Sequence, residues 1–282
     1  MQEYLRILKD VRENGTYKPN RTGIGTYSIS GAMFKFNMTE GGFPLLTTKK
    51  MPPKCIFAEL EGFIKGITDK TWYQERNCHI WDEWCNPAKV PYANDNLTKQ
   101  MMKDESDLGA IYGYQWNDYN GSGINQLKQA IKTLSENPTD RRMLVMAWNP
   151  CQLDQMALPP CHFGFHLISD GRYLDLAWYQ RSVDTFLGLP FNIASYAMLL
   201  RIIAYQTHLQ PRYLIGHLDD VHIYENHLEQ VDLQLSRKPR DLPSLKLINC
   251  DSDDWTIWDW KYTDFELLGY KPYDKITAPV AV

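Results

Sequence analysis

Apolar residues recur at helical spacing in four stretches of this chain, residues 1–15, 54–66, 124–138 and 191–209. An amphipathic helix places an apolar side chain every three or four residues and buries the resulting stripe. The first three stretches show this spacing, and Pro138 ends the third. The fourth is apolar on nearly every side, which predicts a central helix buried in the core.

Another group of stretches alternates between apolar and polar residues, and this period of two is typical of β-strands. Residues 26–38 alternate after a glycine-rich loop and predict a pair of strands. Residues 141–148, 162–169 and 172–180 are strand-like runs, the last two separated by the turn sequence SDGR. The C-terminal part holds further strand-like runs. Because helices and strands mix without regular β-α-β alternation, we assign the chain to the α+β class.

The composition fits one domain spanning residues 1–282, because 44% of the residues are hydrophobic and 13% aromatic, enough for a large core. Residues 88–107 are polar and irregular, and we expect them to form a surface insertion. The formal net charge is −4, and no run of lysine and arginine is longer than a pair. DNA is therefore not expected as a partner, whereas a local basic site for a small anion stays open.

The first 15 residues lack the apolar centre of a signal peptide, and we see no apolar run long enough to span a bilayer. We therefore expect no membrane association and a cytoplasmic protein, in the host cytoplasm if a phage encodes it. The six cysteines form no CxxC pair and show no spacing of a zinc site. In a reducing compartment we expect neither a disulfide nor a bound metal.

One cysteine, Cys161, lies in the unusual sequence MALPPCHFGFH, residues 156–166. A thiol becomes a good nucleophile where positive charge or backbone donors stabilise its thiolate. Arg181 lies beyond the SDGR turn on the next predicted strand, so pairing of those strands would bring a guanidinium near the sulfur. A buried core cysteine is the alternative, and this stretch alone leaves both interpretations open.

Several arginines have the chemistry to hold a phosphate dianion. Arg21, the pair Arg141 and Arg142, and Arg181 supply guanidinium groups, and Ser182 adds a hydroxyl. Taken singly, each arginine is equally explained as an exposed surface residue. Only their convergence in the fold would make an anion site.

Two further segments carry polar side chains suited to a nucleoside. Asn192 stands just before the most apolar helix, and its amide matches the O4 and N3–H edge of uracil. The alternative for Asn192 is a helix N-cap. His222 and Tyr224 are two residues apart and share one face of a predicted strand. They suit a sugar hydroxyl, or they form a buried polar pair.

Taken together, these motifs resemble the thymidylate synthase family, and the resemblance extends along essentially the whole chain. The segments that carry it are ALPPCH, YQRSVDTFLGLPFNIASYA, DRR, RTGIGT, IWDEW, HIYENH and the terminal APVAV. The resemblance implies an α+β fold that works as a symmetric homodimer through one face of its sheet. It also implies dUMP as substrate and 5,10-methylenetetrahydrofolate as cosubstrate, with no metal.

By this resemblance Cys161 adds to C6 of the uracil ring and so activates C5 for a one-carbon donor. Arg141 and Arg142 are expected to reach the phosphate across the dimer interface. Asn192 is implied to read the uracil edge, and His222 and Tyr224 to hold the 3′-hydroxyl. The same-chain residues implied at the nucleotide and its phosphate are Arg21, Gln180, Arg181, Ser182 and Asp184.

The resemblance also assigns proton transfer and folate binding. Glu59 is implied to manage water and proton transfers, with Tyr112 and His162 in the same network. Asp184 is implied to contact the pterin ring, and Lys49 to meet the glutamate tail of the folate. The full set implied around the folate is Lys49, Ile80, Trp81, Trp84, Asp184, Leu187, Gly188, Phe191, Ala281 and Val282.

The chain departs from the usual pattern of the family at Glu61, Ala110, His166, Ala177 and Asp219. Two outcomes are open, because the methylene intermediate at C5 accepts either hydride, giving a methyl group, or water, giving hydroxymethyl. A new acid, a new imidazole and lost bulk would suit a water molecule. Trp81 and the terminal APVAV are intact, and the resemblance implies that they dock folate and exclude water during hydride transfer, which favours methylation. A dUMP hydroxymethylase is the alternative, and a non-catalytic nucleotide- or RNA-binding protein is the third possibility.

Overall fold

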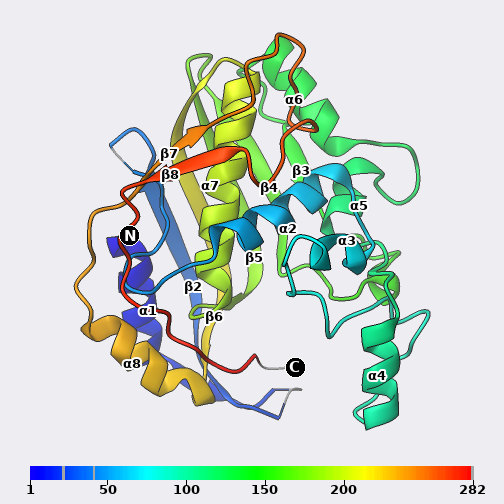
Figure 1. Ribbon diagram of the computed structural model, residues 1–282, viewed down its shortest axis with the longest axis vertical. Coiled ribbons are helices and arrows are strands. Elements are labelled where there is room, and N and C mark those ends of the chain that lie inside the picture. Colours follow the sequence, from blue (N-terminus) through cyan, green and yellow to red (C-terminus); the bar gives the residue numbers. More distant parts are fainter. Residues whose placement is uncertain (21–22, 41, 281–282) are drawn as a thin grey trace.

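The computed structural model describes residues 1–20, 23–40 and 42–280. A six-stranded sheet organises the fold, and a two-stranded ribbon, β7 (Ser244–Leu247) with β8 (Phe265–Leu268), lies apart from it (Figure 1). The strands of the large sheet follow in the spatial order β1 (Thr16–Lys18), β2 (Thr26–Asn37), β6 (Gln210–Tyr224), β5 (Tyr173–Asp184), β4 (His162–Ser169) and β3 (Leu144–Met146).

Only β5 and β6 run parallel, because the long helix α7 (Gly188–Gln206) connects them and returns the chain to the same end of the sheet. The other neighbouring strands of this sheet are antiparallel. Helices and a mixed sheet without regular alternation confirm the α+β assignment.

The four helices expected from the apolar spacing are present: α1 (Gln2–Asn14), α2 (Pro53–Lys65), α6 (Gln126–Glu136) and α7. Four shorter helices were not predicted from the sequence, because they offer too few turns for a clear period. These are α3 (Lys70–Gln74), α4 (Asn96–Asp104), α5 (Tyr112–Asn117) and α8 (Leu228–Ser236), accompanied by 3₁₀ turns at Leu153–Gln155 and Glu225–His227.

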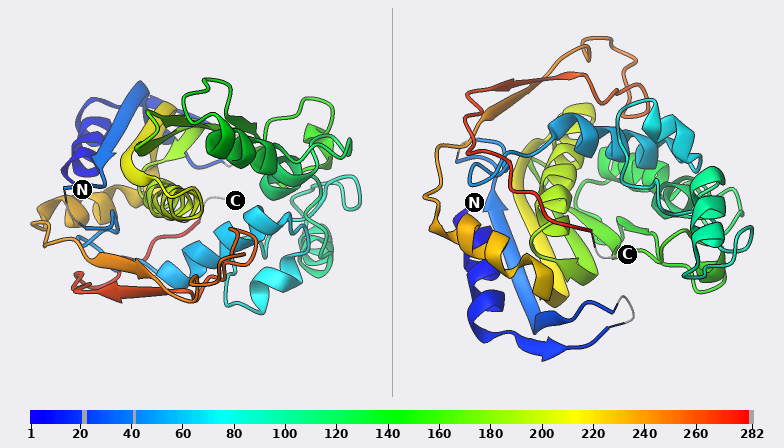
Figure 2. Two further views of the ribbon diagram at one scale, coloured as in Figure 1. Left: turned by 90° about the horizontal axis from the view of Figure 1, so that it is seen from above. Right: turned by 60° about the horizontal axis from the view of Figure 1, so that its bottom comes forward.

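Helix α7 lies across one face of the large sheet, and α2 packs on α7 (Figures 1 and 2). The expectation that no apolar run reaches membrane length was wrong, since α7 is long and apolar enough to cross a bilayer. Two thirds of that helix is buried inside the protein, however, which is the ordinary state of a core helix. The layer between the sheet and α2 is therefore the centre of the hydrophobic core.

The strand pair expected for residues 26–38 is instead one strand, β2. Its register with β6 runs without a shift from Thr26 opposite Tyr224 to Asn37 opposite Tyr213. Gly31 adopts a φ of 81°, which glycine tolerates, so the chain passes this point without a turn. The neighbouring strand β6 thus decides the outcome that local alternation left ambiguous.

The polar insertion of residues 88–107 is more ordered than its composition suggested. It contains α4, whose N-terminus is capped by the Asp95 carboxylate accepting the Thr98 N–H at 2.9 Å. The buried ammonium of Lys70 donates to the carbonyl oxygens of Trp84 at 3.1 Å and Met102 at 2.7 Å. Because Lys70 joins these two segments, the insertion is fastened to the loop that carries Trp84.

Candidate functional site

A cavity of about 750 Å³ opens where β2, β4, β5 and β6 end, between the loops around residues 84–92 and 148–159. Six residues of the expected site line it together, although they come from distant parts of the chain: Trp84, Cys161, Arg181, Ser182, His222 and Tyr224. Strand order explains the meeting, because β5 lies between β4 and β6 in the sheet.

Cys161 lies in a loop that Arg181 holds from the neighbouring strand. The backbone N–H of Arg181 donates to the Cys161 carbonyl at 2.9 Å. The guanidinium of Arg181 donates to the carbonyl oxygens of Pro160 at 2.9 Å and Pro159 at 2.8 Å. The strand pairing expected from the sequence therefore does place a fixed positive charge beside the cysteine loop.

A network of aromatic and imidazole groups supports Cys161 from the core side. The Cys161 backbone N–H donates to the Tyr112 hydroxyl at 2.9 Å, and the Tyr112 ring stacks on His162 with centroids 4.3 Å apart. The Nδ1 atom of His162 lies 2.9 Å from the hydroxyl of Tyr196. Burial lowers the pKa of His162 to about 3, so its imidazole is neutral at physiological pH.

Glu59 lies on α2, facing this network. Burial raises the pKa of Glu59 to about 8, with a smaller contribution from the nearby Cys55, while the Trp81 side chain opposes the shift. Its charge also acts on the Tyr112 hydroxyl, whose pKa is raised mainly by burial. A carboxyl group with a pKa of about 8 close to the Tyr112 hydroxyl is suited to proton transfer.

Asn192 is held by a side chain of the sheet rather than acting as a helix cap. Its residue position is inside α7, whose N-cap is Leu187, so the N-cap alternative was wrong. The Oδ1 atom of Asn192 accepts a hydrogen bond from Nε2 of Gln180 at 3.0 Å. Gln180 itself lies opposite His162 across β4 and β5, which joins the amide pair to the Cys161 network.

The polar residues of β6 are positioned by strand pairing. His222 lies opposite Ser28 on β2 and opposite Asp184 on β5. The rings of His222 and Tyr224 meet edge to face with centroids 5.3 Å apart, and both side chains line the cavity. The shared strand face expected from their spacing is thus realised at the cavity wall.

The residues implied around the folate divide between cavity wall and core. Trp84 lines the cavity, whereas Trp81 is buried in the core and Ile80 is exposed. Asp184 caps the turn into α7, where its Oδ1 atom accepts the N–H groups of Phe186 and Leu187 at 3.0 Å each. Gly188 and Phe191 follow on the first turn of that helix.

Lys49 does not occupy the solvent-facing position that a contact with an extended glutamate tail requires. It is 4% exposed, and its ammonium donates to the Phe186 carbonyl and lies 3.6 Å from the centroid of that ring. Burial lowers the pKa of Lys49 to about 7, against the opposing charge of Asp184. In this arrangement Lys49 supports the turn before α7 from inside.

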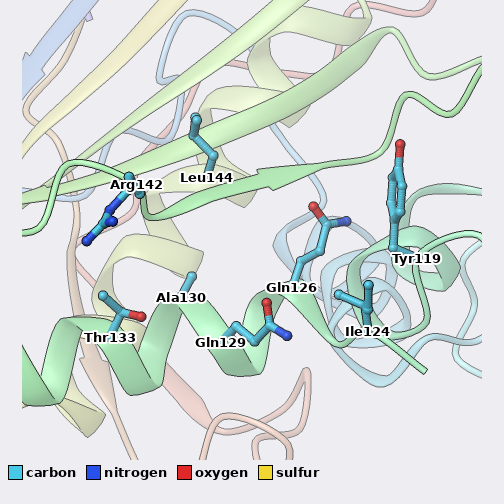
Figure 3. Close-up of a pocket in the computed structure, with 8 residues that line it drawn as sticks. All are labelled: Tyr119, Ile124, Gln126, Gln129, Ala130, Thr133, Arg142 and Leu144. Carbon is cyan, nitrogen blue, oxygen red and sulfur yellow. The ribbon is translucent and has the colours of Figure 1, made fainter. Parts of the chain in front are cut away.

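Arg141 and Arg142 do not line the cavity beside Cys161 in their own chain. Arg142 is exposed, pairs with Asp140, and borders a second cavity of about 280 Å³ with Leu144 and residues of α6 (Figure 3). Three further expected site residues, Arg21, Ala281 and Val282, lie outside the described residues.

The unusual residues face away from this network. Glu61 is buried on the other side of α2, where its carboxylate pairs with Lys65 and accepts the Tyr262 N–H at 2.8 Å. His166 and Ala177 lie opposite each other on β4 and β5. Ala177 alternates with Trp178, which stacks on α7, so both lie on the sheet face turned away from α7. The burial of His166 lowers its pKa.

The two remaining departures, Asp219 and Ala110, do not line the cavity. Asp219 is exposed and does not line the cavity, whereas the adjacent Asp220 does. Ser28 donates to Asp220 at 2.7 Å, and this bond helps to lower the pKa of that carboxyl despite its partial burial. Ala110 is buried, and its N–H donates to the Gln155 carbonyl at 3.3 Å.

Several cavity residues were not identified from the sequence. Trp148 lies 5.3 Å below the Arg181 guanidinium, and Tyr92 lies in the insertion that was expected to be mere surface. The Tyr92 hydroxyl contacts the carbonyl oxygens of Cys85 and Ala157, both at 2.6 Å. For Tyr92, the available signal in the sequence was a lone aromatic residue within a polar segment. The other unexpected lining residues include Pro87, Leu153, Met156 and Leu158.

Among the described residues, no group of three or more histidine, cysteine, aspartate and glutamate side chains is gathered as it would be around a metal ion. The family model described as "Thymidylate synthase" matches residues 2–282.

Proposed function

This chain belongs to the thymidylate synthase family, and from that premise we propose that it methylates dUMP at C5 to give dTMP and dihydrofolate. Enzymes of this family transfer a one-carbon unit from 5,10-methylenetetrahydrofolate to dUMP. The observation that carries the assignment to this chain is the shared cavity, where Cys161, Arg181, Ser182 and His222 meet.

In the proposed reaction the Cys161 thiolate adds to C6 of dUMP, and the electron pair moves to O4 and C5. C5 attacks the methylene carbon of the cosubstrate, and loss of the C5 proton with release of tetrahydrofolate leaves an exocyclic methylene. Hydride from tetrahydrofolate then reduces this group to methyl, and Cys161 leaves. Glu59, with its pKa near 8, is the proposed group for protonating and deprotonating O4 and its bound water.

Substrate binding is proposed to divide between the strands. Arg181 and Ser182 hold the phosphate with Arg21, and His222 with Tyr224 holds the deoxyribose. Asn192 reads the uracil edge by donating to O4 and accepting from N3–H. Trp84 and the turn before α7 hold the folate, and the C-terminal residues Ala281 and Val282 close over it.

The choice of methyl over hydroxymethyl is supported by the orientation of the unusual residues. Water delivery would require Glu61 or His166 to reach the methylene intermediate. Glu61 is instead engaged by Lys65 and the Tyr262 backbone, and His166 lies across the sheet from α7. These contacts favour structural roles for the substitutions. They support hydride, and not water, as the species that adds to the exocyclic methylene.

We further propose a homodimer formed through the sheet face turned away from α7. Met33, Leu144 and Ile168 expose apolar side chains there at 53%, 46% and 39%. Arg142 borders the second cavity with Leu144 and does not line the cavity beside Cys161, which suits a role across the interface.

One reaction tests the proposal. Enzyme, dUMP and methylenetetrahydrofolate are mixed, the nucleotide mass is measured, and dihydrofolate is followed by its near-ultraviolet absorbance. A methylated nucleotide with equimolar dihydrofolate is expected. A hydroxymethylated nucleotide without dihydrofolate would establish the dUMP hydroxymethylase instead, and binding without turnover would point to the non-catalytic alternative.

A further inference from the structure

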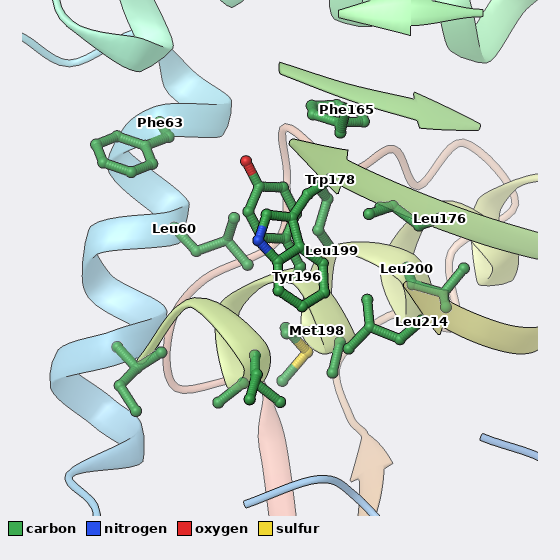
Figure 4. Close-up of a cluster of buried hydrophobic side chains, with 14 of the residues drawn as sticks. Leu60, Phe63, Phe165, Leu176, Trp178, Tyr196, Met198, Leu199, Leu200 and Leu214 are labelled. Atoms are coloured by element: carbon green, nitrogen blue, oxygen red, sulfur yellow. The ribbon is translucent and has the colours of Figure 1, made fainter. Parts of the chain in front are cut away.

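Trp178 lies beneath the proposed base-binding residues, although it touches neither the cavity nor an expected substrate atom. It is fully buried on β5, and Figure 4 shows its indole against the ring of Tyr196. The two rings are stacked, with centroids 5.4 Å apart and planes 9° apart. Gly216 makes the space, because a Cβ atom there would come within 2.4 Å of the indole. The indole therefore has one position.

The polar atom of this indole determines which way the Gln180 amide points. Nε1 of Trp178 lies 3.1 Å from Oε1 of Gln180, and an indole N–H can only donate. At its other end, Nε2 of Gln180 lies 3.1 Å from the Ser182 carbonyl, which can only accept. Both contacts require the same assignment of oxygen and nitrogen, so chemistry alone settles the amide orientation. Gln180 is 2% exposed, and water offers no substitute.

The orientation of Gln180 then fixes Asn192. Nε2 of Gln180 has a second hydrogen, directed at the Asn192 side chain 3.0 Å away, and only the Oδ1 atom can receive it. If Asn192 were flipped, two N–H groups would face each other in a buried place. The NH₂ group of Asn192 is therefore turned to the other side, where the proposed function places the base.

We propose that Trp178 is a positioning residue for base selection, acting through Gln180 to hold Asn192 in the orientation that accepts uracil and rejects cytosine. This inference rests on the proposed function. Uracil presents a carbonyl acceptor at C4 and a donor at N3, which match the fixed NH₂ and the second lone pair of Oδ1. Cytosine presents an amino donor at C4 and an acceptor at N3, so it requires the flipped amide that Gln180 opposes.

The test is the binding of dUMP and dCMP, measured by calorimetry without cosubstrate, to wild type, Trp178→Phe and Trp260→Phe. Phenylalanine keeps the stack on Tyr196 and removes the N–H donor. Trp260 is the matched control, because it is equally buried and its Nε1 has no hydrogen-bond partner among the described residues. The preference for dUMP over dCMP is expected to fall about tenfold in Trp178→Phe and to stay unchanged in Trp260→Phe.

A merely structural role for Trp178 would weaken both nucleotides by the same factor and leave the ratio intact, which would overturn the inference. A second variant, Gln180→Glu, keeps an acceptor for the indole and removes the donor to Asn192. The freed Asn192 is then expected to turn its NH₂ toward Glu and to shift the preference toward dCMP. An unchanged preference for dUMP in this folded variant would also overturn the inference.

The two proposals fail in different ways. If wild type binds neither nucleotide, the proposed function is wrong and the inference falls with it. If wild type prefers dUMP and converts it, but both variants keep the wild-type ratio, only the role of Trp178 is wrong.

Discussion

The two faces of the large sheet show the same alternation of side chains, but only one of them is fully covered within the chain. On the face covered by α7, Trp178 and Gln180 are buried and their polar atoms are paired within the chain. On the opposite face, Met33 and Leu144 expose apolar surface to solvent. Burying a polar group is tolerated only when it is hydrogen-bonded, so the first face must be complete in the monomer. The apolar side chains of the second face can be buried when a partner subunit binds.

By this difference, the proposed chemistry belongs to the single chain, whereas part of the proposed phosphate binding belongs to the proposed dimer. The proposed nucleophile Cys161, its hydrogen-bond network and Asn192, the proposed uracil-binding residue, belong to one chain. The arginines at residues 141–142 do not line this cavity in their own chain, and the proposal is that they serve the site across the dimer interface.

The largest effect is expected at Cys161, the proposed nucleophile, which lies in the loop just before β4. Cys161→Ser should lower turnover by at least roughly 10⁴-fold, because the hydroxyl is a far weaker nucleophile than the thiolate. Cys151→Ser changes an exposed cysteine outside the cavity and should leave turnover unchanged. Steady-state rates with dUMP check both variants. Retained turnover in Cys161→Ser would remove Cys161 from the reaction.

Glu59→Gln should lower kcat by roughly 10²- to 10⁴-fold, since the amide cannot transfer a proton. The wild-type kcat should fall above about pH 8 as the carboxyl ionises, and the variant should lose this limb of the profile. A pH profile without a limb near 8 would contradict the assignment of Glu59.

The substitution Glu59→Gln should also change how the stability of the protein depends on pH. The folded-state pKa of Glu59 lies above its ordinary value of 4.5, so the folded protein binds the extra proton between about pH 4.5 and 8. Wild type should therefore lose stability relative to Glu59→Gln as the pH rises through this window, by about 2 kcal/mol given the partial exposure of the residue. Denaturant unfolding at pH 5 and pH 9 measures the change.

The incomplete face is tested by mixing subunits. Arg142→Ala should raise the KM for dUMP by roughly 10- to 100-fold through loss of a phosphate contact. After reassortment with Cys161→Ser chains, about a quarter of the wild-type activity should return, because half of the dimers then hold one intact site. Arg6→Ala, at an exposed arginine on α1, is the control. No recovery would place Arg142 outside the partner's site.

The smallest catalytic effect is expected from the acid on the far side of α2. Glu61→Gln should leave the ratio of methyl to hydroxymethyl product unchanged and lower the free energy of unfolding by about 2 kcal/mol, because it removes one partner of a buried ion pair. Glu13→Gln, in an exposed pair with Lys9, should cost less than about 0.5 kcal/mol. A changed product ratio in Glu61→Gln would instead support the alternative in which water adds to the methylene intermediate.

The sequence by itself determined the fold class, the long helices and the family, because strong apolar periods and long motifs are local signals. It also predicted that Arg181 would lie near Cys161 if the strands around the SDGR turn pair, and the structure shows that pairing. Local patterns were insufficient where a neighbour decides the conformation. The stretch 26–38 became one strand only because β6 pairs along its whole length.

The tertiary structure alone decided the orientation of side chains that share one helix or strand. Glu59 and Glu61 are two residues apart on α2, yet one faces the Tyr112 network and the other faces Lys65. Residues two apart on a helix point in nearly opposite directions, and only the packing of α2 on α7 says which one meets the site. The same holds for Trp178, whose indole becomes informative only when the strands bring Gln180 and Asn192 to its edge.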